Sequence, residues 1–213
     1  MSGNKLRPKL RLSGPKLKPA IKLGKKIDEP GKIKSLADLR RYYHIGPKDW
    51  DAIIVTDGSG TGWEKAAGWG SVLFRKGELK GMPFGCAASC GTNNVAEIMA
   101  AAWPLLFLSE NDYGVKENGY VVHVVSDSQY VVKGIQALEK TGTMWAASTS
   151  ANRPLWMMIL GARRKGLIIR GHYVPRDTID WNKFCHDLAN AARRKMIGIA
   201  NTVSWDMESI LET

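Results

Sequence analysis

The stretch VVHVVSDSQYVVKGI, residues 121–135, decides the fold, because a β-branched run changes into a helical pattern at one acidic residue. The run through Val125 is apolar except for one histidine, as in a strand buried in the middle of a sheet. From Ser128 onward the apolar residues follow helical spacing. A strand that leads into a crossover helix predicts a parallel α/β unit, with Asp127 at the carboxyl end where ligands bind.

Residues 51–60, DAIIVTDGSG, predict a second buried strand, which ends at Asp57. The glycine-rich stretch 58–70 predicts a turn in which the backbone can approach a ligand closely. It lacks the Lys and Ser or Thr of a phosphate-binding P-loop, so we set that interpretation aside. Residues 70–85 then predict two more strands around a turn at Lys76 and Gly77. The chain thus begins its sheet with a three-stranded meander.

Helices and strands alternate after the meander. Thr92 can cap a helix through residues 96–108 that has Glu97 in its first turns. Residues 155–166 predict another helix and residues 167–175 the last strand. The final helix is expected over residues 182–196, with four residues toward the core: Leu188, Ala189, Ala192 and Met196.

Asp57, Glu97 and Asp127 are the candidate metal ligands. Two of them end strands and the third opens a helix, so they can converge although seventy residues separate Asp57 from Asp127. Carboxylates are the hard oxygen ligands that Mg²⁺ prefers. Taken alone, Glu97 could also be a solvated acid that is stabilised near a helix N-terminus.

The charge of the chain is concentrated at its N-terminal end. Of the net +11, residues 1–34 contribute eleven Lys or Arg minus Asp28 and Glu29, which is +9 and leaves +2 for the rest. Frequent prolines and sparse leucines predict an arm that is disordered on its own. Its role is open between a flexible extension, a targeting segment and a grip on nucleic acid phosphates without sequence choice.

The three cysteines, Cys86, Cys90 and Cys185, cannot all pair, and we expect a reducing, intracellular compartment. A structural zinc is not expected, because no second Cys or His pair at zinc spacing follows. The longest apolar run, residues 98–108, has eleven residues, too few for a membrane helix. No secretory signal core is visible, so we expect a soluble protein without membrane contact.

Five stretches together resemble type 1 ribonuclease H and the wider ribonuclease H-like superfamily. They are VTDGSG (55–60), TNNVAEIMAA (92–101), SDSQYVVKGI (126–135), NRPLW (152–156) and NKFCHDLANAA (182–192). The resemblance implies an α/β ribonuclease H-like fold: a five-stranded mixed sheet, three antiparallel strands and then two parallel ones, flanked by helices. It divides the chain into a basic arm (1–34), a short helix and linker (35–50), a catalytic domain (51–200) and a C-terminal tail (201–213).

The resemblance also implies an activity. The family cuts the RNA strand of RNA:DNA hybrids, as endoribonucleases that leave 5′-phosphomonoesters, with two divalent cations, Mg²⁺ or Mn²⁺. Carried over, Asp57 bridges both ions, Asp127 serves the ion that activates water, and Glu97 serves the ion on the leaving oxygen. Paired cations suit this reaction because they neutralise charge on an anionic phosphodiester.

Substrate contacts follow from the same resemblance. Four residues match contacts to the minor groove of the hybrid: Gly58, Ser59, Asn94 and Gln129. Thr92 and Asn93 match contacts to the DNA strand, and contacts to 2′-hydroxyls distinguish RNA from DNA. Capping and turn chemistry is the alternative role for Thr92, Asn93 and Asn94.

The fourth metal ligand departs from the family pattern. Aligned on Asn182 and Leu188, the family's carboxylate position holds His186, whereas an alignment from the last strand places Asp187 there. We favour His186, since a slip of one residue rotates a helix by about 100°. Imidazole is softer than carboxylate, so His186 predicts a relative preference for Mn²⁺.

The loop before this helix also departs from the pattern. Where the family often has a histidine that helps product leave, this chain has Arg176, a candidate phosphate contact, and slower turnover is expected.

Two alternative functions stay open. One is a nuclease of the same fold that acts on structured DNA or double-stranded RNA, and the other is a non-catalytic nucleic-acid-binding module that uses the arm. We expect a monomer.

Overall fold

The computed structural model describes residues 33–60, 66–78, 80–88, 92–111, 119–142 and 152–196. Expectations for residues 1–32 of the basic arm and for the C-terminal tail therefore fall outside the described residues, whereas Ile33 is buried and its amide donates to the Thr178 carbonyl over 3.0 Å. The elements are, in chain order, α1 (Leu36–Tyr42), β1 (Ala52–Gly60), β2 (Ala67–Arg75), β3 (Met82–Ala88), α2 (Asn93–Glu110), β4 (Tyr120–Ser126), α3 (Gln129–Thr141), α4 (Arg153–Arg164), β5 (Leu167–Tyr173) and α5 (Asp180–Met196).

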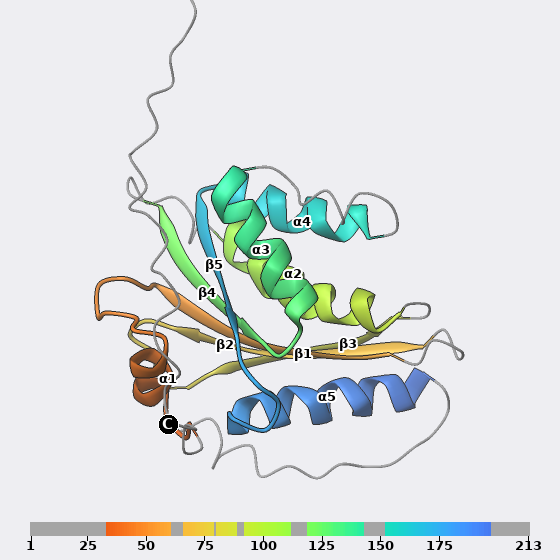
Figure 1. Ribbon diagram of the computed structural model, residues 1–213. Helices are drawn as coiled ribbons and strands as arrows, with labels where there is room; N and C mark the ends of the chain where they lie inside the picture. The colour runs from red at the N-terminus through yellow and green to blue at the C-terminus, as the bar shows by residue number, and fades with distance from the viewer. Residues whose placement is uncertain are drawn as a thin grey trace, which may run out of the picture. The chain divides into compact units, whose positions relative to one another are not determined.

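The five strands form one mixed sheet in the order β3-β2-β1-β4-β5. The β1–β2 and β2–β3 pairs are antiparallel, while β1–β4 and β4–β5 are parallel (Figure 1). The expected ribonuclease H-like sheet is confirmed. In the register of β1 and β4, Thr56 lies opposite Ser126, the last pair between these strands, so the next residues, Asp57 and Asp127, lie at the same edge of the sheet.

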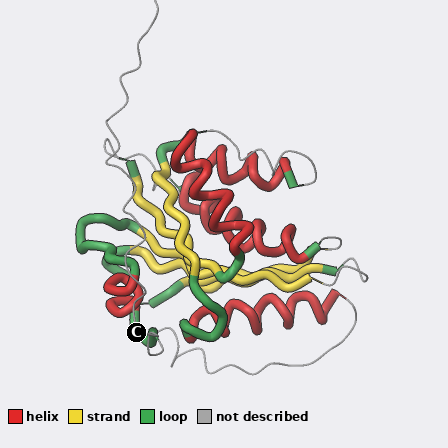
Figure 2. Tube along the Cα trace, in the orientation of Figure 1, coloured by secondary structure: helices red, strands yellow, loops and turns green. Residues whose placement is uncertain are grey.

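Helices cover both faces of the sheet. In Figure 2, α2, α3 and α4 lie on one face and α5 lies on the other. The first layer buries a core that includes Ile54, Ile98 and Trp156, and the second buries one that includes Val55, Trp181 and Phe184. Both cores converge on β1, the strand that carries Asp57. The site is therefore built on a strand that contributes to the cores on both faces of the sheet.

The glycine-rich stretch was interpreted incorrectly in one respect. We expected the chain to turn directly after Asp57, but β1 continues to Gly60 and pairs with the extended start of β2. A Cβ atom on Gly58 would lie 2.4 Å from the backbone nitrogen of Glu97. Gly58 thus allows α2 to approach β1 closely, and this approach brings Glu97 to the end of the strand.

Two helix predictions also need correction. Thr92 occupies the N-cap position of α2, but its side chain makes no capping hydrogen bond. The last helix begins at Asp180, two residues earlier than expected, because Trp181 packs against Phe74 with ring centroids 4.8 Å apart. Of its four predicted core residues Ala189 is buried, Leu188 and Ala192 are half-buried, and the side chain of Met196 is not described.

The segment before the sheet packs against the α5 side of the core. The expected short helix is present, and Ser35 caps it by accepting a hydrogen bond from the Asp38 amide. Leu39, Ile45 and Trp50 are buried in the same cluster as the apolar face of α5. No helix in the described ranges is long and apolar enough to cross a membrane.

A pair of histidines, of which His123 is buried and His172 is half-buried, lies near this segment. His123 Nε2 is 2.9 Å from the Asp49 carbonyl, which can only accept, so this nitrogen carries the proton. His123 Nδ1 then accepts from His172 Nε2 over 2.7 Å. Burial lowers the pKa of His123 to about 4 and that of His172 to about 3. Both rings are thus neutral in the folded protein.

This pair predicts a loss of stability in mild acid. Below about pH 6.5 both histidines take up protons in the unfolded chain, whereas in the folded protein they stay neutral until about pH 4 and pH 3. The free energy of unfolding therefore falls as pH drops toward 4. For His172 the loss is about 2 kcal/mol at pH 5. We expect His172→Gln, which keeps a donor, to remove that part of the pH dependence in urea unfolding at pH 7 and pH 5. Parallel pH profiles for the two proteins would contradict the assignment.

Candidate active site

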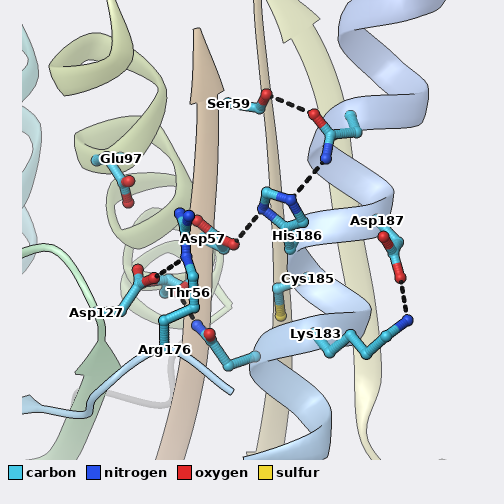
Figure 3. A network of polar contacts seen from close by, with 12 residues as sticks. Thr56, Asp57, Ser59, Glu97, Asp127, Arg176, Lys183, Cys185, His186 and Asp187 are labelled. Carbon is cyan, nitrogen blue, oxygen red and sulfur yellow. Dashed lines mark hydrogen bonds and ion pairs between the residues drawn. The ribbon is translucent and has the colours of Figure 1, made fainter.

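Asp57, Glu97 and Asp127 converge where the pairing of β1 with β4 ends. One carboxylate oxygen from each residue can be chosen so that all three lie within 4.8 Å of one another. Figure 3 shows the three side chains pointing toward one another from β1, α2 and the end of β4. The sequence-based expectation that these acids can meet is thus realised in the geometry.

The cluster is strongly shielded from water. Asp57 is 1% exposed and Glu97 is 4% exposed. Burial, together with the charges of the neighbouring acids, raises the pKa of Asp57 to about 6 and that of Glu97 to about 9. The nearby Gly58 amide and, for Asp57, His186 and Arg176 act in the opposite direction. Three carboxylates this close favour the uptake of positive charge, as protons or as metal ions.

Each of the three acids keeps one buried oxygen without a hydrogen-bond partner among the described residues: Asp57 Oδ1, Glu97 Oε2 and Asp127 Oδ1. A buried polar atom without a partner costs on the order of 1–3 kcal/mol, so it indicates a missing ligand or a functional role. Oxygen atoms of this kind fit a divalent cation such as Mg²⁺. The donor set therefore matches a metal site.

His186 lies beside the cluster, on α5. Its Nδ1 atom is 2.9 Å from Asp57 Oδ2. One turn earlier, the Asn182 side chain donates to the Thr56 carbonyl over 3.4 Å and ties α5 to β1 just before Asp57. Residues four apart share a helix face, so this contact directs His186 at the carboxylate. His186 is not one of the residues that converge within 4.8 Å.

Asp187, the alternative fourth ligand, lies elsewhere on the helix. Its carboxylate accepts a hydrogen bond from Lys183 over 3.0 Å. In Figure 3 this pair points away from Asp57, as the rotation of about 100° per helical residue requires. The geometry thus brings His186, and not Asp187, to the acidic cluster.

Arg176 reaches into the same edge from the loop between β5 and α5. Its Nε atom donates to Asp127 Oδ2 over 3.3 Å, although the side chain is 65% exposed. The negative charge of Asp127 raises the pKa of Arg176 further. Because the guanidinium stays charged and mostly solvated, it is available to an anion that approaches the cluster.

The predicted substrate-binding residues surround this edge. Gly58 and Ser59 end β1, Thr92, Asn93 and Asn94 open α2, and Gln129 opens α3. Asn93 has an internal role as well. Its Oδ1 accepts from the Gly60 amide over 3.1 Å, and its Nδ2 donates to Glu97 over 3.4 Å. Gln129 accepts from Lys133 over 3.2 Å.

Sequence reasoning overlooked Asn190. Its Nδ2 donates to His186 Nε2 over 2.8 Å, and its Oδ1 accepts from the Ser59 hydroxyl over 2.7 Å. The signal was present in the sequence, because Asn190 follows His186 by four residues and so lies on the same face of the helix. Asn190 is neither a metal ligand nor a core residue, and its role depends on a contact with Ser59 that the helix pattern alone does not predict.

A family model for RNase H matches residues 49–194, which include the whole cluster and α5 through Asn190. The ribonuclease H of Syntrophomonas wolfei is 30% identical over 158 residues, covering 68% of this chain and 98% of that protein. The ribonuclease H of Solibacter usitatus is 34% identical over 151 residues, covering 67% of this chain and 94% of that protein. The chain belongs to the RNase H family.

Solved structures agree with this assignment at the level of the fold. LC11-RNase H1 in complex with an RNA/DNA hybrid has a TM-score of 0.55 at 22% identity, covering 68% of this chain and 99% of that one. The N-terminal RNase H domain of a Mycobacterium tuberculosis protein, fused to maltose-binding protein, has a TM-score of 0.53 at 22% identity, covering 70% and 98%. As a member of the RNase H family, the chain is a hydrolytic endoribonuclease.

Proposed function

We propose that this RNase H is a metal-dependent endonuclease that hydrolyses the RNA strand of RNA:DNA hybrids and leaves 5′-phosphomonoesters. The observation that carries the proposal is the convergence within 4.8 Å of three acids, two of them buried and one half-buried, on the sheet edge of this family's fold. A relative of the same fold, LC11-RNase H1, was solved in complex with an RNA/DNA hybrid. The N-terminal arm adds a nonspecific grip on phosphates, and the protein works as an intracellular monomer.

Asp57, Glu97 and Asp127 would hold two divalent cations, Mg²⁺ or Mn²⁺, with His186 as a fourth ligand. When bound, such ions neutralise the scissile phosphate, lower the pKa of water and stabilise the leaving oxygen. The three oxygens that lack hydrogen-bond partners support this assignment, since they offer a preformed, acceptor-only surface. The proximity of His186 to Asp57 supports a place for the imidazole at the same site.

The other residues of the edge bind and orient the substrate. Ser59, Asn94 and Gln129 contact the minor groove, where the backbone at Gly58 and the Glu97 side chain lie near 2′-hydroxyl groups. These contacts give the preference for RNA over DNA. Thr92 and Asn93 contact the DNA strand. Arg176, exposed beside Asp127, attracts the scissile phosphate by its fixed charge.

The test is a panel of end-labelled substrates: a hybrid, a double-stranded RNA and a double-stranded DNA of one sequence, and a branched DNA as the structured substrate. We expect cleavage of the RNA strand of the hybrid, 5′-phosphate ends, faster turnover with Mn²⁺ than with Mg²⁺, and no cleavage in a chelator. Cleavage of double-stranded RNA or structured DNA in preference to the hybrid would favour the same-fold alternative. Tight hybrid binding without cleavage in either metal would favour a non-catalytic binding module.

A further inference from the structure

Four side chains form a continuous hydrogen-bonded chain at the edge of the metal site. Ser59 Oγ donates to Asn190 Oδ1 over 2.7 Å, and Asn190 Nδ2 donates to His186 Nε2 over 2.8 Å. His186 Nδ1 then lies 2.9 Å from Asp57 Oδ2. An amide nitrogen can only donate, so His186 Nε2 accepts, and the single proton of the neutral ring sits on Nδ1 and points at Asp57.

This tautomer orients Asp57 but cannot bind a cation. A histidine that ligates a metal offers a nitrogen lone pair, and Nδ1, the nitrogen that faces Asp57, carries a proton in this arrangement. A histidine ligand also donates its other N–H to a neighbouring acceptor, which fixes the ring. For His186 to ligate through Nδ1, the proton must therefore reside on Nε2, opposite an acceptor.

Asn190 can supply that acceptor without any change in the fold. A half-turn of its amide puts Oδ1 opposite His186 Nε2 and Nδ2 opposite Ser59. The Ser59 hydroxyl, which donates in the first arrangement, can accept in the second. The contacts of Ser59 with Asn190 and of Asn190 with His186 Nε2 are hydrogen bonds in both arrangements, whereas His186 Nδ1 and Asp57 Oδ2 are both acceptors in the second one and need a cation between them. The number of protons is unchanged, because one leaves Nδ1 for water and one reaches Nε2 from water at a ring whose side chain is 37% exposed.

We propose that Asn190, backed by Ser59, is a positioning residue that allows His186 to exchange between two neutral tautomers. One donates Nδ1–H to Asp57, and the other turns the Nδ1 lone pair toward the cation held by the carboxylates. The inference rests on the proposed function, since it presupposes a metal ion at this site. His186 is then a ligand only in the metal-bound protein. Before metal binds, it orients Asp57 through a hydrogen bond.

The first test is the affinity for Mn²⁺ alone, from the free-ion signal in electron paramagnetic resonance at pH 7. Asn190→Leu should weaken binding about tenfold, as the loss of a ligand's outer hydrogen bond does. In a His186→Ala background the same substitution should change nothing, because its effect passes through the imidazole. Wild-type affinity in Asn190→Leu, or an equal loss in both backgrounds, would overturn the proposal.

Asn190→Asp is the matched variant. An aspartate there can only accept, so it fixes the proton on Nε2 and should bind Mn²⁺ at least as tightly as wild type. Because the added charge alone would also favour the ion, His186→Ala/Asn190→Asp is the control, and a gain of equal size there would contradict the tautomer model. Thermal unfolding of each variant verifies that the fold is intact.

The second test reads the tautomer directly, from two-bond ¹H–¹⁵N correlations of the imidazole rings. The signal of His186 is identified by its absence in His186→Ala. We expect Nδ1–H in metal-free protein and Nε2–H after Zn²⁺, a diamagnetic ion that accepts mixed nitrogen and oxygen ligands, is added. A ring that keeps Nδ1–H with Zn²⁺ bound would exclude the exchange.

Asp57→Asn separates this inference from the proposed function. If Asp57→Asn loses Mn²⁺ binding while Asn190→Leu does not, the carboxylate site stands and the tautomer exchange fails. If Asp57→Asn binds Mn²⁺ as wild type does, the proposed metal site itself fails.

Discussion

Asp57→Asn is expected to reduce metal-dependent cleavage of the hybrid by at least about a thousandfold, because removal of the central carboxylate forfeits several kcal/mol of transition-state stabilisation. The variant preserves shape. An asparagine Oδ1 can still accept from His186 Nδ1, and the residue stays at the end of a strand whose apolar residues are buried. The loss should therefore come from the missing charge. Single-turnover rates with saturating enzyme measure it without interference from product release.

The control for Asp57→Asn is Glu110→Gln. Glu110 lies at the end of α2, and its carboxylate forms an exposed ion pair with Lys165. Removing this charge should leave the cleavage rate within about twofold, since exposed ion pairs contribute little. Residual cleavage by Asp57→Asn at a tenth of the wild-type rate would mean that catalysis is centred elsewhere. Circular dichroism shows whether each variant is folded.

The acidic cluster could be predicted because each of its members ends or opens an element with a strong sequence pattern. The short, β-branched apolar runs before Asp57 and Asp127 are typical of central strands, and parallel strands bring their carboxyl ends to one edge. His186 was placed at the site by the resemblance to ribonuclease H, aligned on Asn182 and Leu188. Spacing alone could not give its contact with Asp57, because that contact depends on how α5 packs against β1.

The features that sequence reasoning missed depend on close packing between elements. The sequence predicted Gly58 as part of a turn. In the structure it matters because a Cβ atom at this position would lie 2.4 Å from the Glu97 backbone nitrogen of α2. Composition cannot distinguish these roles, because glycine suits turns and close contacts equally. The early start of α5 likewise depends on Trp181, whose partner Phe74 is more than a hundred residues away.

Glu97→Gln is expected to abolish metal-dependent cleavage and to stabilise the metal-free protein by about 2–3 kcal/mol at pH 7. In the unfolded chain Glu97 is ionised at this pH, whereas in the folded chain burial and the charges of Asp57 and Asp127 raise its pKa from 4.5 to about 9. The folded state must therefore take up a proton or bury a charge, and each pKa unit costs about 1.4 kcal/mol. Glutamine is neutral and avoids this cost.

The sign of the pH dependence tests the cause of this stabilisation. A folded state that holds the extra proton becomes less stable as pH rises between about 4.5 and about 9. The difference in free energy of unfolding between Glu97→Gln and the wild type should thus be near zero at pH 4.5 and grow steadily up to pH 8. It is measured by urea unfolding with a chelator present. Glu110→Gln, on the same helix but exposed, should show no such slope. A stability difference that does not change with pH would indicate that glutamine packs better, and not that it removes the cost of a buried charge.

The same argument explains why a destabilising residue is retained at this position. Saturating Mg²⁺ should stabilise the wild type, because a cation takes the place of the proton and of the missing partners of the three carboxylate oxygens. In Glu97→Gln that metal-dependent gain should shrink or vanish. Glu97→Gln should then be the more stable protein without metal, and the wild type the more stable one at saturating Mg²⁺. This reversal is expected of a site whose buried charges lower stability in order to bind a metal.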